Sequence, residues 1–128
     1  KLLIATAKRL GLPIWGNAVL VCTEGPRFET LAEIKMFRQL GCDVVGMTGI
    51  PEAVLARELE MCYASFCFVS NMAAGAQEQL APIEVSKISE IILTSLEQVL
   101  IGSIKALPSE RGSNCPCANA LKNARIKQ

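Results

Sequence analysis

The chain has 128 residues, of which 51% are hydrophobic and 20% are charged, and its formal net charge is +1. This length suits one domain, and the hydrophobic fraction is high enough for a packed core rather than disorder. Near-neutral charge and 5% aromatic residues give no electrostatic or stacking surface for nucleic acid. Because no uninterrupted apolar run reaches about 18 residues, we expect no membrane partner.

The histidine and cysteine content excludes several types of catalytic and metal site and indicates the redox compartment. With no histidine in this chain, it cannot form a Ser-His-Asp triad, a Cys-His nucleophile pair or an HExxH zinc site. Four of the six cysteines lie in apolar runs, which is typical of a protein of the reducing cytoplasm. Cys115 and Cys117 lie apart in a polar segment. Such a pair is usually incidental, with a metal site or a vicinal disulfide as the alternatives.

Apolar periodicity predicts helices that alternate with short strands. In chain order we expect a helix over 1–10, a strand over 14–22, a helix over 31–40, a strand over 43–47, a helix over 51–60, a strand over 63–69, a loop over 70–81 and a long helix from Pro82 to about Ala106. Residues 1–107 would belong to one α/β domain. Residues 108–128 would form a polar tail with room for a short helix over 118–127.

This alternation favours an α/β fold with a largely parallel sheet, in which ligands bind at the carboxyl ends of the strands. The three loops at those ends carry Phe28, Glu29, Met47, Thr48 and Asn71. An aromatic ring, a carboxylate, a thioether, a hydroxyl and an amide suit a flat, polar-edged ligand better than a metal ion.

Each of these residues also has a purely structural explanation. Glu29 and Thr48 lie where helices begin, so they could serve as helix-start residues. Asn71 suits a turn, and Phe28 and Met47 suit the core. The residue types alone therefore support a small-molecule site in an α/β domain and leave its ligand open.

Three motifs specify more: EGPRFET at 24–30, VGMT followed by PEAVLARE at 45–58, and SNMAAG at 70–75. Over residues 14–106 the chain resembles the trimeric purine nucleoside phosphorylase and methylthioadenosine phosphorylase family. The resemblance implies a nucleoside phosphorylase-like (Rossmann-like), mixed and largely parallel sheet flanked by helices. It covers only the C-terminal half of such enzymes, without their glycine-rich phosphate loop, so we expect this chain alone to be inactive.

The resemblance implies that phosphate cleaves the N-glycosidic bond of a purine nucleoside, giving the free base and ribose 1-phosphate or its 5-methylthio analogue. Phosphate is a co-substrate, no cofactor or metal is expected, and the full-length protein would be a homotrimer. By resemblance, Phe28 packs on the base, Glu29 accepts from its N1–H, and Met47 lies under the ribose. Thr48 contacts phosphate. Asn71 reads the base near N7 and O6 and acts as the catalytic residue by stabilising charge on the leaving purine.

Two positions bear on substrate choice. Glu29 and Asn71 complement the N1–H donor and O6 acceptor of a 6-oxopurine, so inosine, guanosine or 5′-methylthioinosine is favoured. The resemblance also suggests that Val85 and Ile88 line the pocket for the 5′ substituent. The alternatives are a 5′-methylthioadenosine phosphorylase, or a non-catalytic purine-binding or assembly fragment.

Overall fold

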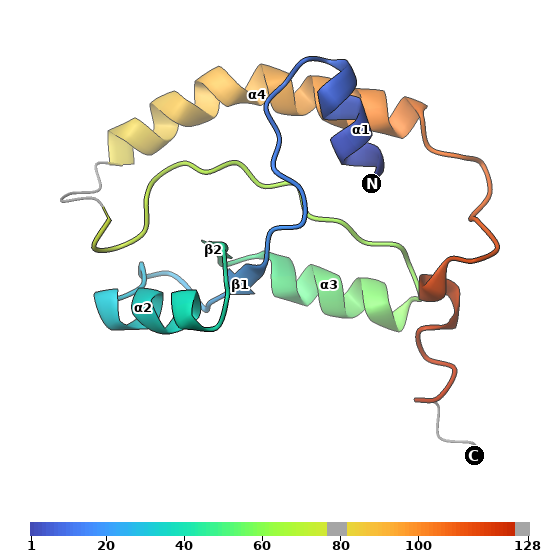
Figure 1. Ribbon diagram of the computed structural model, residues 1–128, viewed down its shortest axis with the longest axis horizontal. Coiled ribbons are helices and arrows are strands. Elements are labelled where there is room, and N and C mark those ends of the chain that lie inside the picture. Colours follow the sequence, from blue (N-terminus) through green and yellow to red (C-terminus); the bar gives the residue numbers. More distant parts are fainter. Residues whose placement is uncertain (77–81, 125–128) are drawn as a thin grey trace.

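The computed structural model describes residues 1–76 and 82–124. Its elements in chain order are α1 (Leu2–Arg9), β1 (Leu20–Cys22), α2 (Leu31–Gln39), β2 (Val44–Gly46), α3 (Gly49–Glu58), α4 (Pro82–Lys105) and the 3₁₀ helix η1 (Pro116–Asn119). The two strands pair in parallel. In Figure 1, α4 and α1 lie on one side of the molecule, and α2, the strands and α3 lie on the other. The helices and the small parallel sheet confirm the α/β expectation.

Four predicted helices are confirmed, with small changes at their ends. α1 ends at Arg9, and α2 ends before Gly41, whose φ of 80° is the left-handed conformation that terminates a helix. α4 runs from Pro82, as expected. α3 begins at Gly49 rather than Pro51. The first-turn N–H groups of a helix have no intrahelical partner, so a proline there removes no hydrogen bond.

The predicted strand over 14–22 is largely wrong, because only Leu20–Cys22 forms a strand. Asn17 adopts a φ of 63°, which interrupts the extended backbone, and Trp15 is 87% exposed. The apolar run therefore predicted too long a strand, because a strand also needs backbone hydrogen-bond partners along its whole length.

The strand expected over 63–69 is also wrong. Within the described residues the sheet contains β1 and β2 only. This segment comes after α3 in the chain. The Tyr63 hydroxyl donates to Glu52 Oε2 of α3 at 3.0 Å and lies 3.1 Å from Ser65 Oγ. The loop expected over 70–81 is seen as far as residue 76, and residues 77–81 lie outside the described part.

The closest helix packing joins α1 to α4. Thr6 and Ala7 of α1 and Val99 and Ser103 of α4 are buried. Gly102 allows this approach, because a Cβ there would lie 2.9 Å from Thr6 Cγ2. A side chain at position 102 would therefore require the Thr6 side chain or one of the two helices to shift.

A capping box fixes the start of α2. The Thr30 N–H donates to Glu33 Oε2 at 2.7 Å, and the Glu33 N–H donates to Thr30 Oγ1 at 3.3 Å. Arg27 adds two bonds to the same carboxylate, at 2.9 and 2.7 Å. Hydrogen bonds from Arg27, then from the Thr30 backbone and hydroxyl, lower the pKa of Glu33 to about 2. The T-x-x-E spacing is the sequence signature of this arrangement.

The C-terminal segment returns to the end of α3 (Figure 1). Arg111 Nη1 donates to the Glu60 carbonyl at 2.9 Å. In place of the helix expected over 118–127, the chain forms η1 and then turns as far as residue 124. Residues 125–128 lie outside the described part.

The same return brings Cys62 and Cys115 together. Their sulfur atoms lie 3.3 Å apart. The hydrogen bond between them is the main reason that the pKa of Cys62 is raised to about 11 and the pKa of Cys115 is lowered.

In the part of the chain that the structure describes, no helix combines the length and the apolar character needed to cross a bilayer.

We expect Gly102→Ala to lower the melting temperature of the complete protein. Overpacking costs about 1–3 kcal/mol, whereas alanine gains about 1 kcal/mol in helix propensity. Gly112→Ala is the control, because a Cβ there meets nothing within 4 Å. Thr6→Ser removes the opposing methyl group, so the double variant should lose less than the two single losses combined. If the double variant loses as much as the two single variants combined, Thr6 and position 102 are not in close contact.

The Glu33 carboxylate should titrate at about pH 2 when followed by carbon NMR. Because this pKa is lowered by folding, the ion pair stabilises the protein fully above the unfolded-state pKa of about 4.3, and the contribution is lost as the pH falls towards 2. Arg27→Gln should raise the Glu33 pKa, whereas Arg38→Gln, at the other end of α2, should leave it unchanged. A Glu33 pKa that does not respond to Arg27→Gln would show that the guanidinium is not its main partner.

Candidate functional site

Parallel pairing places the ends of β1 and β2 at one edge of the sheet. Cys22 lies opposite Gly46, so the loops that begin at Thr23 and Met47 start side by side. Gly25 lies against the thioether of Met47, since a Cβ on Gly25 would be 3.0 Å from Met47 Sδ. The first two strand-end loops are therefore neighbours, as the argument from parallel strands predicted.

The third loop reaches the same region by a different contact. Gly75, in the SNMAAG motif, has a φ of 81° and lies against Leu31 in the first turn of α2. A Cβ at position 75 would require the Leu31 side chain to move, and the left-handed backbone conformation favours glycine there. This contact brings the loop that contains Asn71 up to the helix that follows Glu29.

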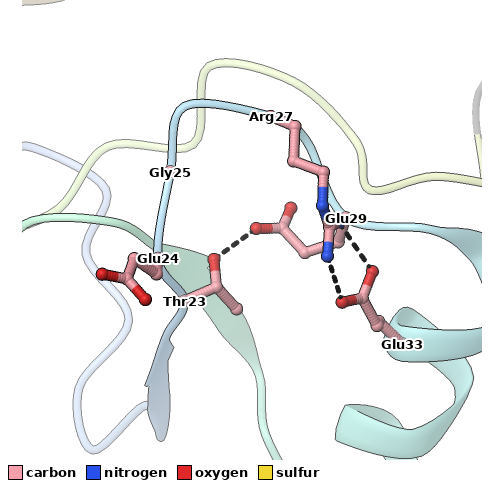
Figure 2. A pocket seen from close by; sticks show the side chains of 6 residues that line it. All are labelled: Thr23, Glu24, Gly25, Arg27, Glu29 and Glu33. Atoms are coloured by element: carbon pink, nitrogen blue, oxygen red, sulfur yellow. Dashed lines mark hydrogen bonds and ion pairs between the residues drawn. The ribbon is translucent and has the colours of Figure 1, made fainter.

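A pocket of about 350 Å³ lies within this region. Its lining is mostly polar and comprises Thr23, Glu24, Gly25, Arg27, Glu29 and Glu33 (Figure 2). The Thr23 hydroxyl donates to Glu29 Oε1 at 2.5 Å, and this bond fixes the half-buried Glu29 carboxylate. Glu24 points to the opposite side of the loop (Figure 2).

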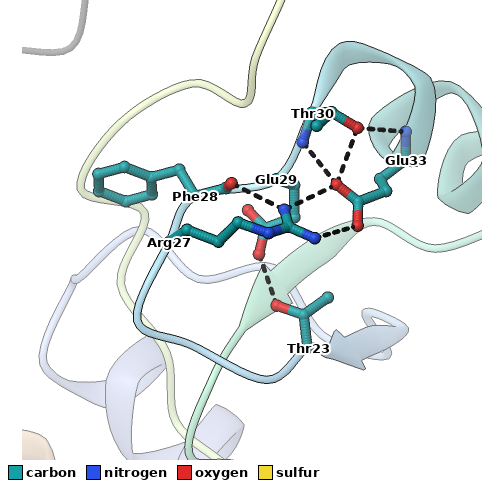
Figure 3. Close-up of polar contacts among 6 residues, drawn as sticks. All are labelled: Thr23, Arg27, Phe28, Glu29, Thr30 and Glu33. Carbon is teal, nitrogen blue, oxygen red and sulfur yellow. Dashed lines mark hydrogen bonds and ion pairs between the residues drawn. The ribbon is translucent and has the colours of Figure 1, made fainter.

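The pocket is negatively charged, since the residues that line it carry three carboxylates and one guanidinium. Arg27 is held by Glu33 and also donates to the Phe28 carbonyl at 3.1 Å (Figure 3). Its pKa is raised, first by the hydrogen bond to Glu33 and then by the charge of that carboxylate. Because Glu33 neutralises Arg27, the remaining carboxylates favour a ligand that presents N–H or O–H donors over a free anion.

Among the predicted residues, Glu29 lines this pocket and Met47 packs beside it against Gly25. Phe28 is 61% exposed, and its ring projects away from the Arg27–Glu33 pair (Figure 3). Thr48 is the residue before α3, yet its side chain makes no capping hydrogen bond. The contacts of ligands with these residues remain predictions.

Asn71 makes local hydrogen bonds. Its Oδ1 accepts from Ser70 Oγ at 2.7 Å, and its Nδ2 donates to the Met72 carbonyl at 3.0 Å. Val85 lies in the first turns of α4, but its side chain lies outside the described part. Ile88, further along the same helix, is half-buried. Neither position is brought to the pocket by a described contact.

Sequence reasoning named Glu29 alone among the six lining residues and missed the other five, which are Thr23, Glu24, Gly25, Arg27 and Glu33. Thr23 directly follows β1, which is a signal that it belongs to a strand-end loop. Arg27 lies inside the EGPRFET motif, but its partner is six residues further along, in the first turn of a helix. The path of the loop between Arg27 and Glu33 brings the two side chains together, so their separation in the sequence does not by itself predict the ion pair.

Comparison with known proteins identifies the family. Residues 1–105 match the model of the phosphorylase superfamily. The chain is 49% identical over 125 residues to the 6-oxopurine nucleoside phosphorylase of Pyrococcus furiosus, covering 97% of this chain and 46% of that protein. It is 54% identical over 111 residues to the probable S-methyl-5′-thioinosine phosphorylase of Methanothermobacter thermautotrophicus, covering 86% and 39%.

The chain thus spans about half the length of the curated relatives it matches. The family match nevertheless covers most of the chain, including the loops after β1 and β2 and the SNMAAG segment. The resemblance inferred from the motifs is confirmed, and the chain belongs to the phosphorylase superfamily.

Proposed function

We propose that the complete protein is a purine nucleoside phosphorylase that prefers 6-oxopurine nucleosides, with inosine, guanosine and S-methyl-5′-thioinosine as candidate substrates. Phosphate would cleave the N-glycosidic bond and yield the free base with ribose 1-phosphate or its 5-methylthio analogue. The observation that carries this proposal is the half-buried Glu29 carboxylate, held by Thr23 at the wall of a polar pocket. The names of the relatives are consistent with it.

Glu29 and Asn71 together account for the preference for a 6-oxopurine. Such a base presents N1–H as a donor and O6 as an acceptor, which suit a carboxylate and an amide N–H. The Asn71 Nδ2 carries two hydrogens, and its bond to the Met72 carbonyl needs only one. Adenine would place an N1 acceptor against the Glu29 carboxylate, and a polar mismatch of this kind can cost a factor on the order of 10⁴.

Phe28 and Met47 would provide the apolar contacts. The Phe28 ring is exposed and free of the ion pair beside it (Figure 3), which suits stacking on a flat base. Met47 lies beside the loop that carries Glu29, where a thioether can pack under a ribose. In this proposal, Val85 and Ile88 of α4 line the pocket for the 5′ substituent.

Phosphate would bind near Thr48 rather than in the negatively charged pocket. Thr48 is exposed, and its hydroxyl is not used to cap α3. The N-terminus of a helix also attracts anions through its unpaired N–H groups and its dipole. Phosphate would serve as a co-substrate, and the proposed reaction uses no cofactor.

The proposed mechanism needs no protein nucleophile. As the glycosidic bond lengthens, the sugar gains oxocarbenium character and phosphate attacks its anomeric carbon. Negative charge builds on the departing purine, where an Asn71 N–H would stabilise it near N7 and O6. Catalysis of this kind consists of positioning and of dipoles directed at the transition state.

We further propose that the complete sheet is Rossmann-like, mixed and largely parallel, and that the enzyme is a cytoplasmic homotrimer. The parallel β1–β2 pair supports the sheet topology. Large apolar side chains such as Leu40 and Ile91 are 72% and 77% exposed, which supports association. Six free cysteines support a reducing compartment.

The proposal is tested by measuring base release from inosine, S-methyl-5′-thioinosine and S-methyl-5′-thioadenosine with the complete protein. Release should require phosphate and should favour the two 6-oxopurine substrates. Glu29→Gln should lower kcat/KM for inosine by roughly 10–100-fold, because a hydrogen bond to a charged group contributes about 1.5–3 kcal/mol.

Glu24→Gln is the matched control, because Glu24 lines the same pocket but points away from Thr23 and Arg27 (Figure 2). It should leave kcat/KM nearly unchanged. If Glu29→Gln lowers only the melting temperature, Glu29 is a structural partner of Thr23 and not a base contact. Base release that is independent of phosphate would refute a phosphorylase.

Asn71→Asp should shift preference from inosine towards adenosine, because an ionised carboxylate accepts from a 6-amino group and cannot donate to O6. The measurement is the ratio of kcat/KM for the two nucleosides. Asn123→Asp, in the C-terminal segment, adds the same charge elsewhere and should not change the ratio. An unchanged ratio in Asn71→Asp would remove Asn71 from base recognition.

A further inference from the structure

Three cysteines from two distant parts of the chain meet beyond the end of α3, apart from the candidate pocket. The sulfur atoms of Cys62, Cys115 and Cys117 all lie within 4.8 Å of one another. Those of Cys62 and Cys115 are 3.3 Å apart, across 53 positions of sequence. This cluster plays no part in the function proposed above.

Local backbone structure holds the two C-terminal thiols on one side of a turn. Cys115 donates its N–H to the Gly112 carbonyl at 3.0 Å and immediately precedes η1, whose first residue is Pro116. The Ala120 N–H bonds to the Cys117 carbonyl at 3.1 Å. The turn therefore presents Cys115 and Cys117 together, independently of Cys62.

Polar contacts on either side of the cluster join the C-terminal segment to α3. Arg111 donates to the Glu60 carbonyl at 2.9 Å, and the Leu121 N–H donates to Glu60 Oε1 at 3.2 Å. Arg57 of α3 also reaches the Ala120 carbonyl, at 3.5 Å. These hydrogen bonds involve residues on both sides of Cys115 and Cys117 in the sequence. They hold the C-terminal segment against the end of α3, and this packing brings Cys62 close to the other two cysteines.

We propose that Cys62, Cys115 and Cys117 form a three-thiolate site for a thiophilic metal ion, with Zn²⁺ as the expected occupant. A tetrahedral zinc ion with Zn–S bonds of about 2.3 Å separates its sulfur ligands by about 3.8 Å. The Cys62–Cys115 sulfur separation of 3.3 Å is about 0.5 Å shorter than that value, and every separation within the cluster is at most 4.8 Å, so small movements would reach the tetrahedral spacing. A disulfide would use only two of the three thiols and needs its sulfurs about 2.05 Å apart.

The donor set selects the class of metal. Thiolates are soft ligands that prefer Zn²⁺ or Cu⁺ to Mg²⁺ or Ca²⁺. Cys62 is exposed, and Cys117 also lines a cavity of about 150 Å³, so an ion and a water molecule as fourth ligand have access. A Zn²⁺ ion held by three thiolates has a net charge of −1, which the nearby Arg111 guanidinium would offset.

The consequence is a metal clamp between the end of α3 and the C-terminal segment. A metal ion that binds the folded protein stabilises the folded state by mass action, because the unfolded chain does not hold the three thiols together and binds the ion more weakly. Zinc should therefore raise the melting temperature of the complete protein.

The test uses the complete protein, reduced and freed of metal with a chelator, and titrates it with Co²⁺ and then Zn²⁺. We expect one Co²⁺ per chain, with thiolate-to-cobalt charge-transfer absorption that Zn²⁺ abolishes by displacement. Cys62→Ser and Cys117→Ser should each weaken Zn²⁺ binding by more than the roughly 10–100-fold that loss of an outer-shell partner costs. Cys67→Ser is the matched control, because Cys67 is an exposed free cysteine outside the cluster.

The spectrum of the unsubstituted protein keeps the proposal falsifiable even if a variant fails to fold. No charge-transfer absorption from the reduced protein, or Zn²⁺ binding that Cys62→Ser leaves intact, would overturn it. A disulfide within the cluster, found by mass spectrometry in protein isolated without added oxidant, would overturn it as well.

Discussion

Backbone hydrogen bonds hold β1 and β2 in parallel, with Leu20 opposite Val44 and Cys22 opposite Gly46. At the entry to the sheet, the Val19 N–H also donates to the Asp43 carboxylate at 2.7 Å. At its exit, the Thr23 N–H donates to the Gly46 carbonyl at 2.9 Å. This pairing fixes which loops share an edge, so the positions of Thr23 and Met47 follow from two three-residue strands.

Charge is distributed unevenly around that edge. Arg27 is committed to Glu33, where it reinforces the cap of α2 and holds the loop that carries Glu29. Glu29 is fixed separately by Thr23. Glu33 therefore has a structural role at the start of α2, Glu29 is the carboxylate proposed for recognition, and the positive charge of Arg27 limits their mutual repulsion.

The packing of this chain leaves much apolar surface exposed. Among the described residues, the buried hydrophobic side chains are Ala7, Ala56 and Val99, whereas Trp15 and Leu40 are largely exposed. Exposed apolar surface on this scale is typical of faces that become buried by association. The cysteine cluster beyond α3 adds a polar, chemically distinct means of joining two segments.

The sequence by itself determined four of the helices, α1 to α4, and the family. The start of α2 is encoded in Thr30 and Glu33 and its end in Gly41, because helical hydrogen bonds and caps join residues only a few positions apart. The tertiary structure alone decided that residues 63–69 form no strand, that Thr23 holds Glu29, and that Cys62 meets Cys115. Strand pairing and side-chain clusters depend on partners brought from elsewhere by the path of the backbone, and local sequence patterns do not carry that information.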